Sequence, residues 1–248
     1  MRHSTVRIRL LGLGLAACAF LVLGPVAGSA IGEAGASSIW TVQPTPNNGT
    51  DFNQLSAISA NTASDVWAVG TFRGSSSPAF KTLVEHFDGS SWRGVKSPNV
   101  GTLNNELNGV SADSTADAWA VGFRELGNTD QTLTERWNGT TWSVVSSPNV
   151  GSSGNALRGV SAISPSDAWA VGAVGNSAAT LAEHWDGSAW TVVPTPTPLG
   201  GATLAAVDAV SPNDVWAVGG LGDGDDGAFA EHWDGSSWTI VPTAPLSG

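Results

Sequence analysis

Tyrosine is absent from the 248-residue sequence, the only methionine is Met1, and the only cysteine, Cys18, lies within the first 30 residues. A single cysteine allows neither a disulfide within the chain nor a zinc site built from several cysteines. Charged residues are scarce, at 12%, whereas hydrophobic residues make up 41% and glycine and proline number 31 and 13. This composition is typical of a turn-rich globular protein and excludes a disordered chain.

Basic residues are the scarcest charged class. Only seven Lys and Arg residues lie beyond residue 30, together with all 21 Asp and Glu residues, so this part of the chain carries a formal charge of −14. Such an acidic surface repels phosphate backbones and anionic lipids. The sequence therefore predicts no nucleic-acid partner.

The N-terminus has the three-part pattern of a secretory signal. Three arginines within the first nine residues precede an apolar run from Leu10 to Val26, and small residues follow at 27–30. We expect residues 1–30 to be a signal peptide cleaved near Ala30, or alternatively near Ala36. The mature chain would then have no membrane span and would be secreted or cell-surface.

Two other interpretations of this leader stay open. The apolar run is about long enough to remain as an uncleaved membrane anchor. The residues Leu15-Ala16-Ala17-Cys18 also resemble a bacterial lipoprotein box, which would make Cys18 a lipidation site.

The rest of the chain is a repeat with a period near 50 residues. The string Asp-x-Trp-Ala-Val-Gly occurs four times, with its tryptophan at Trp67, Trp119, Trp169 and Trp216. A second string ends in a tryptophan at Trp92, Trp142, Trp190 and Trp238, and Trp40 begins an orphan copy of its end. A fixed period of this length indicates stacked supersecondary units.

Each unit has the pattern of four short strands, which in the third unit cover 157–163, 168–173, 180–185 and 190–193. In the second strand both alternating faces are apolar, which indicates a sheet packed between two neighbours, with the Asp-x-Trp tryptophans in the core. Four strands per unit is the blade of a propeller. The predicted fold is therefore all-β, a β-propeller of about four four-stranded antiparallel blades with an extra N-terminal strand.

The predicted propeller spans 39–243. Its units cover approximately 53–96, 105–146, 155–194 and 202–242, and the extra strand is the orphan segment 39–43. This strand has two possible positions, either docked on a sheet edge or paired with another copy of the chain.

The spacing of the motifs separates uniform turns from variable loops. A leucine always lies 12 residues before the Asp-x-Trp tryptophan, and a glutamate always lies 7 residues before the second tryptophan, whereas the two tryptophans of a unit are 25, 23, 21 and 22 residues apart. The variation therefore falls in the loop between strands two and three. In an up-and-down blade this loop shares one face with the connection from strand four to the next strand one.

We expect ligand contacts on this variable face. The candidate ligand-binding residues are Arg73, Arg124, Asp223, Asp225 and Asp226. The three aspartates lie in one glycine-rich loop and are also a calcium candidate, because calcium prefers oxygen ligands. The alternative is an acidic loop exposed to solvent.

The strings Asp167–Gly172 and Trp185–Trp190 resemble the repeats of Kelch and Asp-box (BNR, Ycf48-like) β-propellers and of exported bacterial proteins with Trp-Ala-Val-Gly repeats. The similarity covers about 39–243. The string Asp-Gly-Ser-x-Trp of this chain is one residue shorter than the usual Asp-box string, Asp-x-Gly-x-Thr-Trp. The resemblance implies that a side-chain oxygen binds the turn backbone at Asp88, Asn138, Asp186 and Asp234.

Two enzyme classes among these propellers require tyrosine. Sialidases use a tyrosine nucleophile, and galactose oxidase uses a tyrosine–cysteine crosslink and tyrosine copper ligands. This chain can supply neither, so we assign no catalytic residue and no cofactor. The adjacent pairs Glu85/His86, Glu183/His184 and Glu231/His232, with Glu135/Arg136 in the second unit, point to opposite faces of a strand, and we expect structural roles for them.

The sequence therefore predicts a secreted, non-catalytic binding or scaffold module that presents its variable loops to a protein or glycan ligand. One alternative is a polysaccharide hydrolase or lyase that uses two carboxylates in the central funnel. A second alternative is an assembly factor like the Ycf48 group.

Overall fold

The computed structural model describes residues 41–175, 179–222 and 227–243. The chain divides into two compact units, and the larger one, which includes Thr45–Gly248, contains all strands of the described residues. The smaller unit is Arg9–Pro44, of which only 41–44 are described. The expected signal peptide and Cys18 lie outside the described residues.

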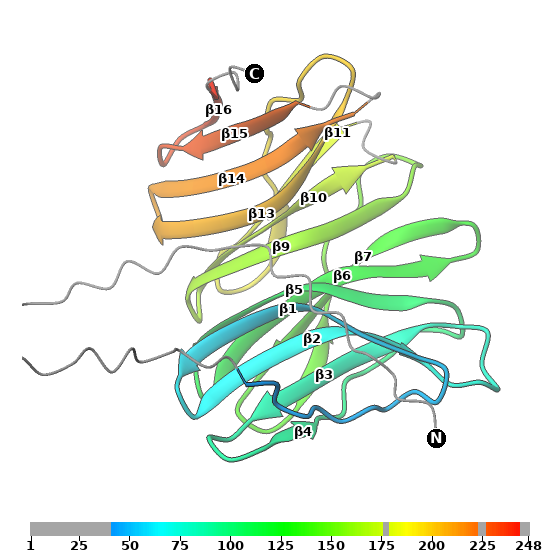
Figure 1. Ribbon diagram of the computed structural model, residues 1–248. Coiled ribbons are helices and arrows are strands. Elements are labelled where there is room, and N and C mark those ends of the chain that lie inside the picture. Colours follow the sequence, from blue (N-terminus) through cyan, green and yellow to red (C-terminus); the bar gives the residue numbers. More distant parts are fainter. Residues whose placement is uncertain (1–40, 176–178, 223–226, 244–248) are drawn as a thin grey trace, which may run out of the picture. The chain divides into compact units, whose positions relative to one another are not determined.

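The strands form four antiparallel sheets, each with its four strands in chain order (Figure 1). Sheet 1 contains β1 (Phe52–Thr62), β2 (Asp65–Arg73), β3 (Lys81–Phe87) and β4 (Trp92–Gly94). Sheet 2 contains β5 (Asn105–Ser114), β6 (Asp117–Leu126), β7 (Thr129–Trp137) and β8 (Trp142–Val145).

The second half of the chain repeats this arrangement. Sheet 3 contains β9 (Asn155–Ser164), β10 (Asp167–Val174), β11 (Ala179–Trp185) and β12 (Trp190–Val192). Sheet 4 contains β13 (Ala202–Ser211), β14 (Asp214–Leu221), β15 (Ala228–Trp233) and β16 (Trp238–Val241). The predicted all-β fold of four four-stranded blades is confirmed, and the strand bounds predicted for the third unit differ from β9–β12 by at most two residues.

The glycine of each Asp-x-Trp-Ala-Val-Gly string lies beside a β-bulge in the same sheet. In sheet 2 the register between β5 and β6 shifts between Leu107 and Gly109, directly after the pair Leu107 and Gly122. A Cβ on Gly122 would lie 1.9 Å from the carbonyl oxygen of Glu106. The close approach is therefore to the first strand of the same sheet.

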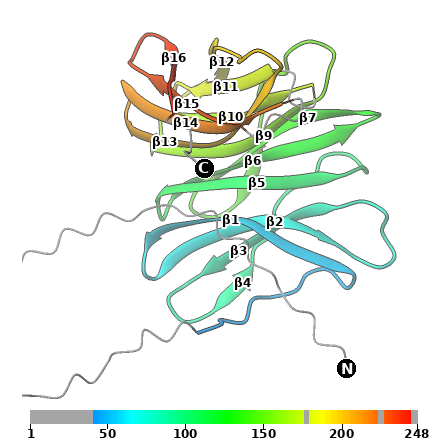
Figure 2. The same cartoon turned by 45° about the horizontal axis from the view of Figure 1, so that its top comes forward.

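Successive sheets pack face to face (Figures 1 and 2). We call the side of a sheet that contacts the following sheet its leading face, and the side that contacts the preceding sheet its trailing face. Trp67 and Val69 on the leading face of sheet 1 pack with Leu107 and Leu133 on the trailing face of sheet 2. Two further clusters of the same kind join sheets 2 and 3 and sheets 3 and 4.

Both sides of β6 and β10 are buried, because sheets 2 and 3 each lie between two other sheets. Trp67, Trp119 and Trp169 are at most 2% exposed. Trp216 differs from the expected core position, since its side is the leading face of sheet 4 and it is 39% exposed. Among the fourth-strand tryptophans, Trp142, Trp190 and Trp238 are buried and Trp92 is half-buried.

The expected extra strand is not formed over its described part. Residues 39 and 40 lie outside the described residues, and 41–49 contain no strand. Val42 is fully accessible to solvent. A strand needs a hydrogen-bonding partner, and the fourth-strand position of sheet 4 is occupied by β16 of the same chain.

Candidate functional site

The two sets of loops differ as the motif spacing suggests. Every turn between strands one and two has two residues, and every turn between strands three and four has four. The loops between strands two and three have different lengths and cover 74–80, 127–128, 175–178 and 222–227. We call the side that carries these loops and the connections between sheets the variable face.

On the opposite side, each four-residue turn is held by the side chain of its first residue. Asp186 Oδ1 accepts hydrogen bonds from the backbone N–H groups of Ser188 and Ala189 and from the Ser188 hydroxyl. These bonds lower the pKa of Asp186 to about 2, and the bond from the Ser188 hydroxyl has the largest effect. The same contacts are made by Asp88, Asn138 and Asp234.

The residue after each third-strand glutamate contacts the aspartate of the Asp-x-Trp string. His86 Nε2 lies 2.6 Å from Asp65 Oδ1, and its ring packs on Trp67 with a centroid distance of 4.3 Å. Arg136 takes the place of the histidine in sheet 2, where it binds Asp117 and lies over Trp119. These pairs fix the start of the second strand.

The glutamates themselves are buried, with 0% exposure at Glu85, Glu135, Glu183 and Glu231. Glu135, Glu183 and Glu231 lie between two sheets, whereas Glu85 lies on the trailing face of sheet 1 beside residues Thr45–Asn47. Burial raises the pKa of Glu135 and of Glu183 to about 8. Ser97 donates a 2.6 Å hydrogen bond to Glu135, whereas neither carboxylate oxygen of Glu183 has a partner among the described residues. Groups so enclosed are unsuited to contact a large ligand.

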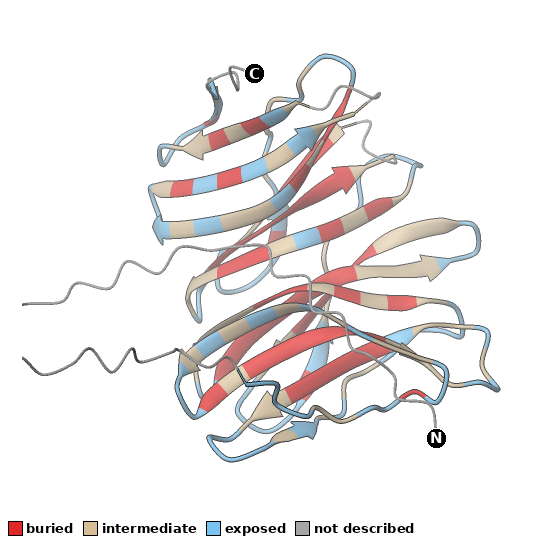
Figure 3. Ribbon diagram, viewed as in Figure 1, coloured by how far each residue is buried: buried red, intermediate tan, exposed pale blue. Residues whose placement is uncertain are grey.

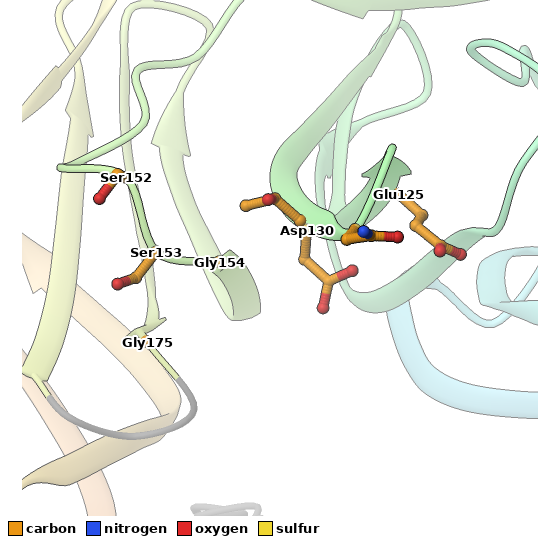
Figure 4. A pocket seen from close by; sticks show the side chains of 8 residues that line it. Glu125, Asp130, Ser152, Ser153, Gly154 and Gly175 are labelled. Carbon is orange, nitrogen blue, oxygen red and sulfur yellow. The ribbon is translucent and has the colours of Figure 1, made fainter.

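A polar pocket of about 370 Å³ opens on the variable face between sheets 2 and 3 (Figure 4). Its volume falls in the range of small-ligand sites. The end of the β6–β7 hairpin provides one wall and the connection into β9 provides the other. The lining residues are Glu125, Asn128, Thr129, Asp130, Ser152, Ser153, Gly154 and Gly175.

The loops around this pocket are held by side-chain hydrogen bonds. Asn155 is buried, its Oδ1 accepts a hydrogen bond from the N–H of Val150, and its Nδ2 donates to the carbonyls of Val150 and Ser153. On the other wall, Asn104 Nδ2 donates a 2.8 Å hydrogen bond to Glu125. The pocket is therefore largely formed in advance of any ligand.

The electrostatics of the pocket favour hydrogen-bond donors. Partial burial, and then the nearby carboxylate of Glu125, raise the pKa of Asp130. Asp130 in turn adds to the effect of burial in raising the pKa of Glu106 on β5. No Lys, Arg or His lines the pocket, so the site suits ligand hydroxyl or amino groups and disfavours anions.

The two arginines predicted as ligand-binding residues do not line the pocket, and each already has a side-chain partner. Arg73 forms a 2.7 Å ion pair with Asp51 and lies over the ring of Phe80. Arg124 donates to Gln131 and does not line the pocket, although it is next to Glu125. The aspartates Asp223, Asp225 and Asp226 lie outside the described residues.

The sequence interpretation missed the pocket residues. A pocket between two sheets depends on which loops become neighbours, and the motif spacing locates only the face. A usable signal was the serine- and glycine-rich connection 151–154, which lies opposite the shortest loop between strands two and three.

The described part of the chain lacks two further features. It contains no group of three or more His, Cys, Asp or Glu side chains placed to hold a metal ion. It also contains no helix of the length and apolarity that a bilayer crossing requires.

Comparison with known proteins shows similarity of fold. No protein-family model and no curated protein matches the sequence. Among solved structures, the chain resembles YCF48 bound to D1 peptide, with a TM-score of 0.52, 15% identity, and coverage of 83% of this chain and 56% of that one.

A second similar structure is a fungal lectin from Aleuria aurantia, described as a six-bladed β-propeller with a novel fucose recognition mode. The TM-score is 0.52 at 16% identity, and the match covers 79% of this chain and 63% of the lectin. The chain thus spans less than two thirds of the length of both. These matches show a propeller-like fold, and they confirm the expected resemblance to the Ycf48 group at the level of fold.

Proposed function

We propose that the protein is a non-catalytic binding module that takes a neutral glycan in the pocket between sheets 2 and 3. The observation that carries this proposal is the lining, which consists of hydroxyls, an amide and carboxylates with no basic residue. Carboxylates and amides are suited to bind sugar hydroxyls in a fixed geometry. The recognition of fucose by a lectin of similar fold agrees with this choice, as a precedent for the fold.

The position of the pocket also supports a binding role. It lies where two variable loops and a connection between sheets meet, on a rigid scaffold, and such loops commonly carry recognition. From the leader we further propose that the protein acts outside the cytoplasm, either released or attached at the cell surface.

A glycan array followed by calorimetry of the bound sugars tests the proposal. Asp130→Asn removes the charge of a pocket acceptor without changing its shape, and we expect the affinity to fall by about tenfold or more. The matched control is Asp186→Asn in the exposed β11–β12 turn outside the pocket, where Asn138 makes the same contacts in sheet 2, and it should leave the affinity unchanged.

Four results would contradict this function. Binding of no glycan would remove its basis, and equal loss with both variants would place the ligand elsewhere. Release of new reducing ends from a bound polysaccharide would instead support the hydrolase alternative. Capture of a defined envelope protein with no sugar dependence would support the assembly-factor alternative.

A further inference from the structure

The three interfaces between the sheets are built in the same way. In each, the second-strand tryptophan of one sheet contacts two tryptophans of the next: Trp67 with Trp137 and Trp142, Trp119 with Trp185 and Trp190, and Trp169 with Trp233 and Trp238. The ring centroids of these pairs are 4.9–5.3 Å apart. Such aromatic contacts stabilise an interface beyond the area they bury.

A hydrogen bond between the first strands repeats as well. In each interface the hydroxyl of a serine on the leading face accepts a 3.0 Å hydrogen bond from a backbone N–H of the next sheet. The pairs are Ser59 with Ala112, Ser111 with Ala162, and Ser161 with Ala209. Each interface therefore consists of two complementary halves with fixed chemistry.

The leading face of sheet 4 is one such half without its partner among the described residues. Trp216 is 39% exposed and Val218 is 48% exposed, whereas Val69, Val121 and Val171 at the position of Val218 are 0% exposed. Asp208 occupies the position of the serine and is exposed. Figure 3 shows the alternation of buried and exposed residues along β14.

The end of the trailing face of sheet 1 that carries Ile58, Phe87 and Trp92 is the other half, whereas Leu83 and Glu85 on the same face are already buried, beside residues Thr45–Asn47. Ile58 is 61% exposed, whereas Val110 and Val160 at the same position are 7% and 8% exposed. Phe87 and Trp92, with centroids 5.5 Å apart, correspond to the tryptophan pairs that receive an indole in the other sheets. In the described chain, no second-strand tryptophan of another sheet contacts this pair.

We propose that the leading face of sheet 4 docks on the trailing face of sheet 1 in a second copy of the chain. The partner is a second copy because the same two halves already fit each other three times within one molecule. Trp216 of one copy then contacts Phe87 and Trp92 of the second copy. The carboxylate of Asp208 accepts a hydrogen bond from the backbone N–H of Ala60 in the second copy. The two faces differ, so the contact is head-to-tail and leads to a closed ring or an open chain of copies.

This contact uses sheet faces, not the orphan strand that the sequence suggested for self-association. The fourth-strand position of sheet 4 is filled by β16 in the same chain. The exposed aromatic and aliphatic side chains lie on the faces themselves, where they would be buried by the contact.

Sedimentation velocity of the purified protein over a range of concentrations tests the proposal. Trp216→Asp blocks the leading face of sheet 4, and Ile58→Asp blocks the trailing face of sheet 1. Ile58 is 61% exposed and Trp216 is 39% exposed, so neither variant buries its new carboxylate completely, and circular dichroism checks that both fold. We expect each variant alone to associate about thirtyfold or more weakly than the wild type. The matched control, Leu199→Asp, changes a fully exposed leucine outside both faces and should associate as the wild type does.

Mixing the two variants separates head-to-tail docking from other contacts. Each variant keeps the face that the other has lost, so the mixture should form a heterodimer and stop there. The proposal is overturned if the wild type stays monomeric at all concentrations. It is equally overturned if either variant alone associates as the wild type does, or if the mixture fails to associate while the wild type does.

Discussion

At the scale of single residues, some positions of the repeat accept only one type of residue because of the atoms that surround them. Gly122 is the clearest case, because β5 bulges directly beside it and leaves no space for a Cβ. The equivalent glycines, Gly70, Gly172 and Gly219, face a carbonyl oxygen at 1.9–2.0 Å from the same ideal Cβ position. The glycine of the motif is thus required by the bulge within each sheet.

We therefore predict that Gly122→Ala destabilises the protein by about 1–3 kcal/mol or more, because backbone atoms must move to admit the methyl group. Urea unfolding followed by tryptophan fluorescence measures the change. The control is Gly74→Ala, where the added Cβ would lie 3.9 Å from the Thr50 hydroxyl and no other heavy atom is as close. Equal stability of the two variants would show that the bulge is not a constraint.

At the scale of elements, an asparagine holds the segment that precedes the first strand in each of sheets 1, 2 and 3, and it is buried in sheets 2 and 3 and half-buried in sheet 1. Asn53, Asn105 and Asn155 are equivalent in the repeat, whereas Ala202 takes this place in sheet 4. Each asparagine bonds backbone groups of the segment that precedes its strand. Only the connection held by Asn155 carries pocket residues.

Asn155→Ala should therefore loosen the wall formed by Ser152 and Ser153 and weaken ligand binding in addition to stability. Three hydrogen bonds are lost, so we expect a destabilisation of about 1–3 kcal/mol. Hydrogen exchange of residues 150–154 and calorimetry with the bound glycan check both effects. Asn53→Ala is the control, which should cost stability but leave affinity intact. A loss of affinity in both variants would argue against the pocket.

The sequence predicts the elements well because each depends on local patterning. The apolar second strand, the turn aspartates and the fixed spacings define four strands per unit. The exposure of Trp216 could not be predicted in this way, because its string is identical to that of Trp67, and what distinguishes it is that no sheet among the described residues follows sheet 4. The pocket likewise depends on which loops become neighbours after stacking.

At the scale of the whole molecule, the buried glutamates predict an unusual pH dependence. Burial raises the pKa of Glu135 and Glu183 from 4.5 to about 8, raises the pKa of Glu85 to about 7, and raises the pKa of Glu231. The folded protein therefore favours the neutral acids. Their contribution to stability is complete below the unfolded pKa near 4.5 and is lost as the pH rises through the folded values.

We thus expect the urea midpoint to be lower at about pH 8.5 than at about pH 5. The lowered pKa values of Asp186 and Asp234 act only below this window, because the stability they provide is lost as the pH falls toward 2. Glu183→Gln should reduce the pH dependence, because it removes one of the buried acids. A midpoint that is constant or rises across the window would contradict the burial of these acids.

Each sheet encloses the second-strand indole of the preceding sheet, and of the four such indoles Trp216 alone stays open in the described chain. Hydroxyl-radical footprinting with mass spectrometry, at protein concentrations low enough to keep the chain monomeric, tests it most directly. We expect rapid oxidation of Trp216 and strong protection of Trp67, Trp119 and Trp169. Equal oxidation of all four, or protection of Trp216 with oxidation of Trp119, would contradict it.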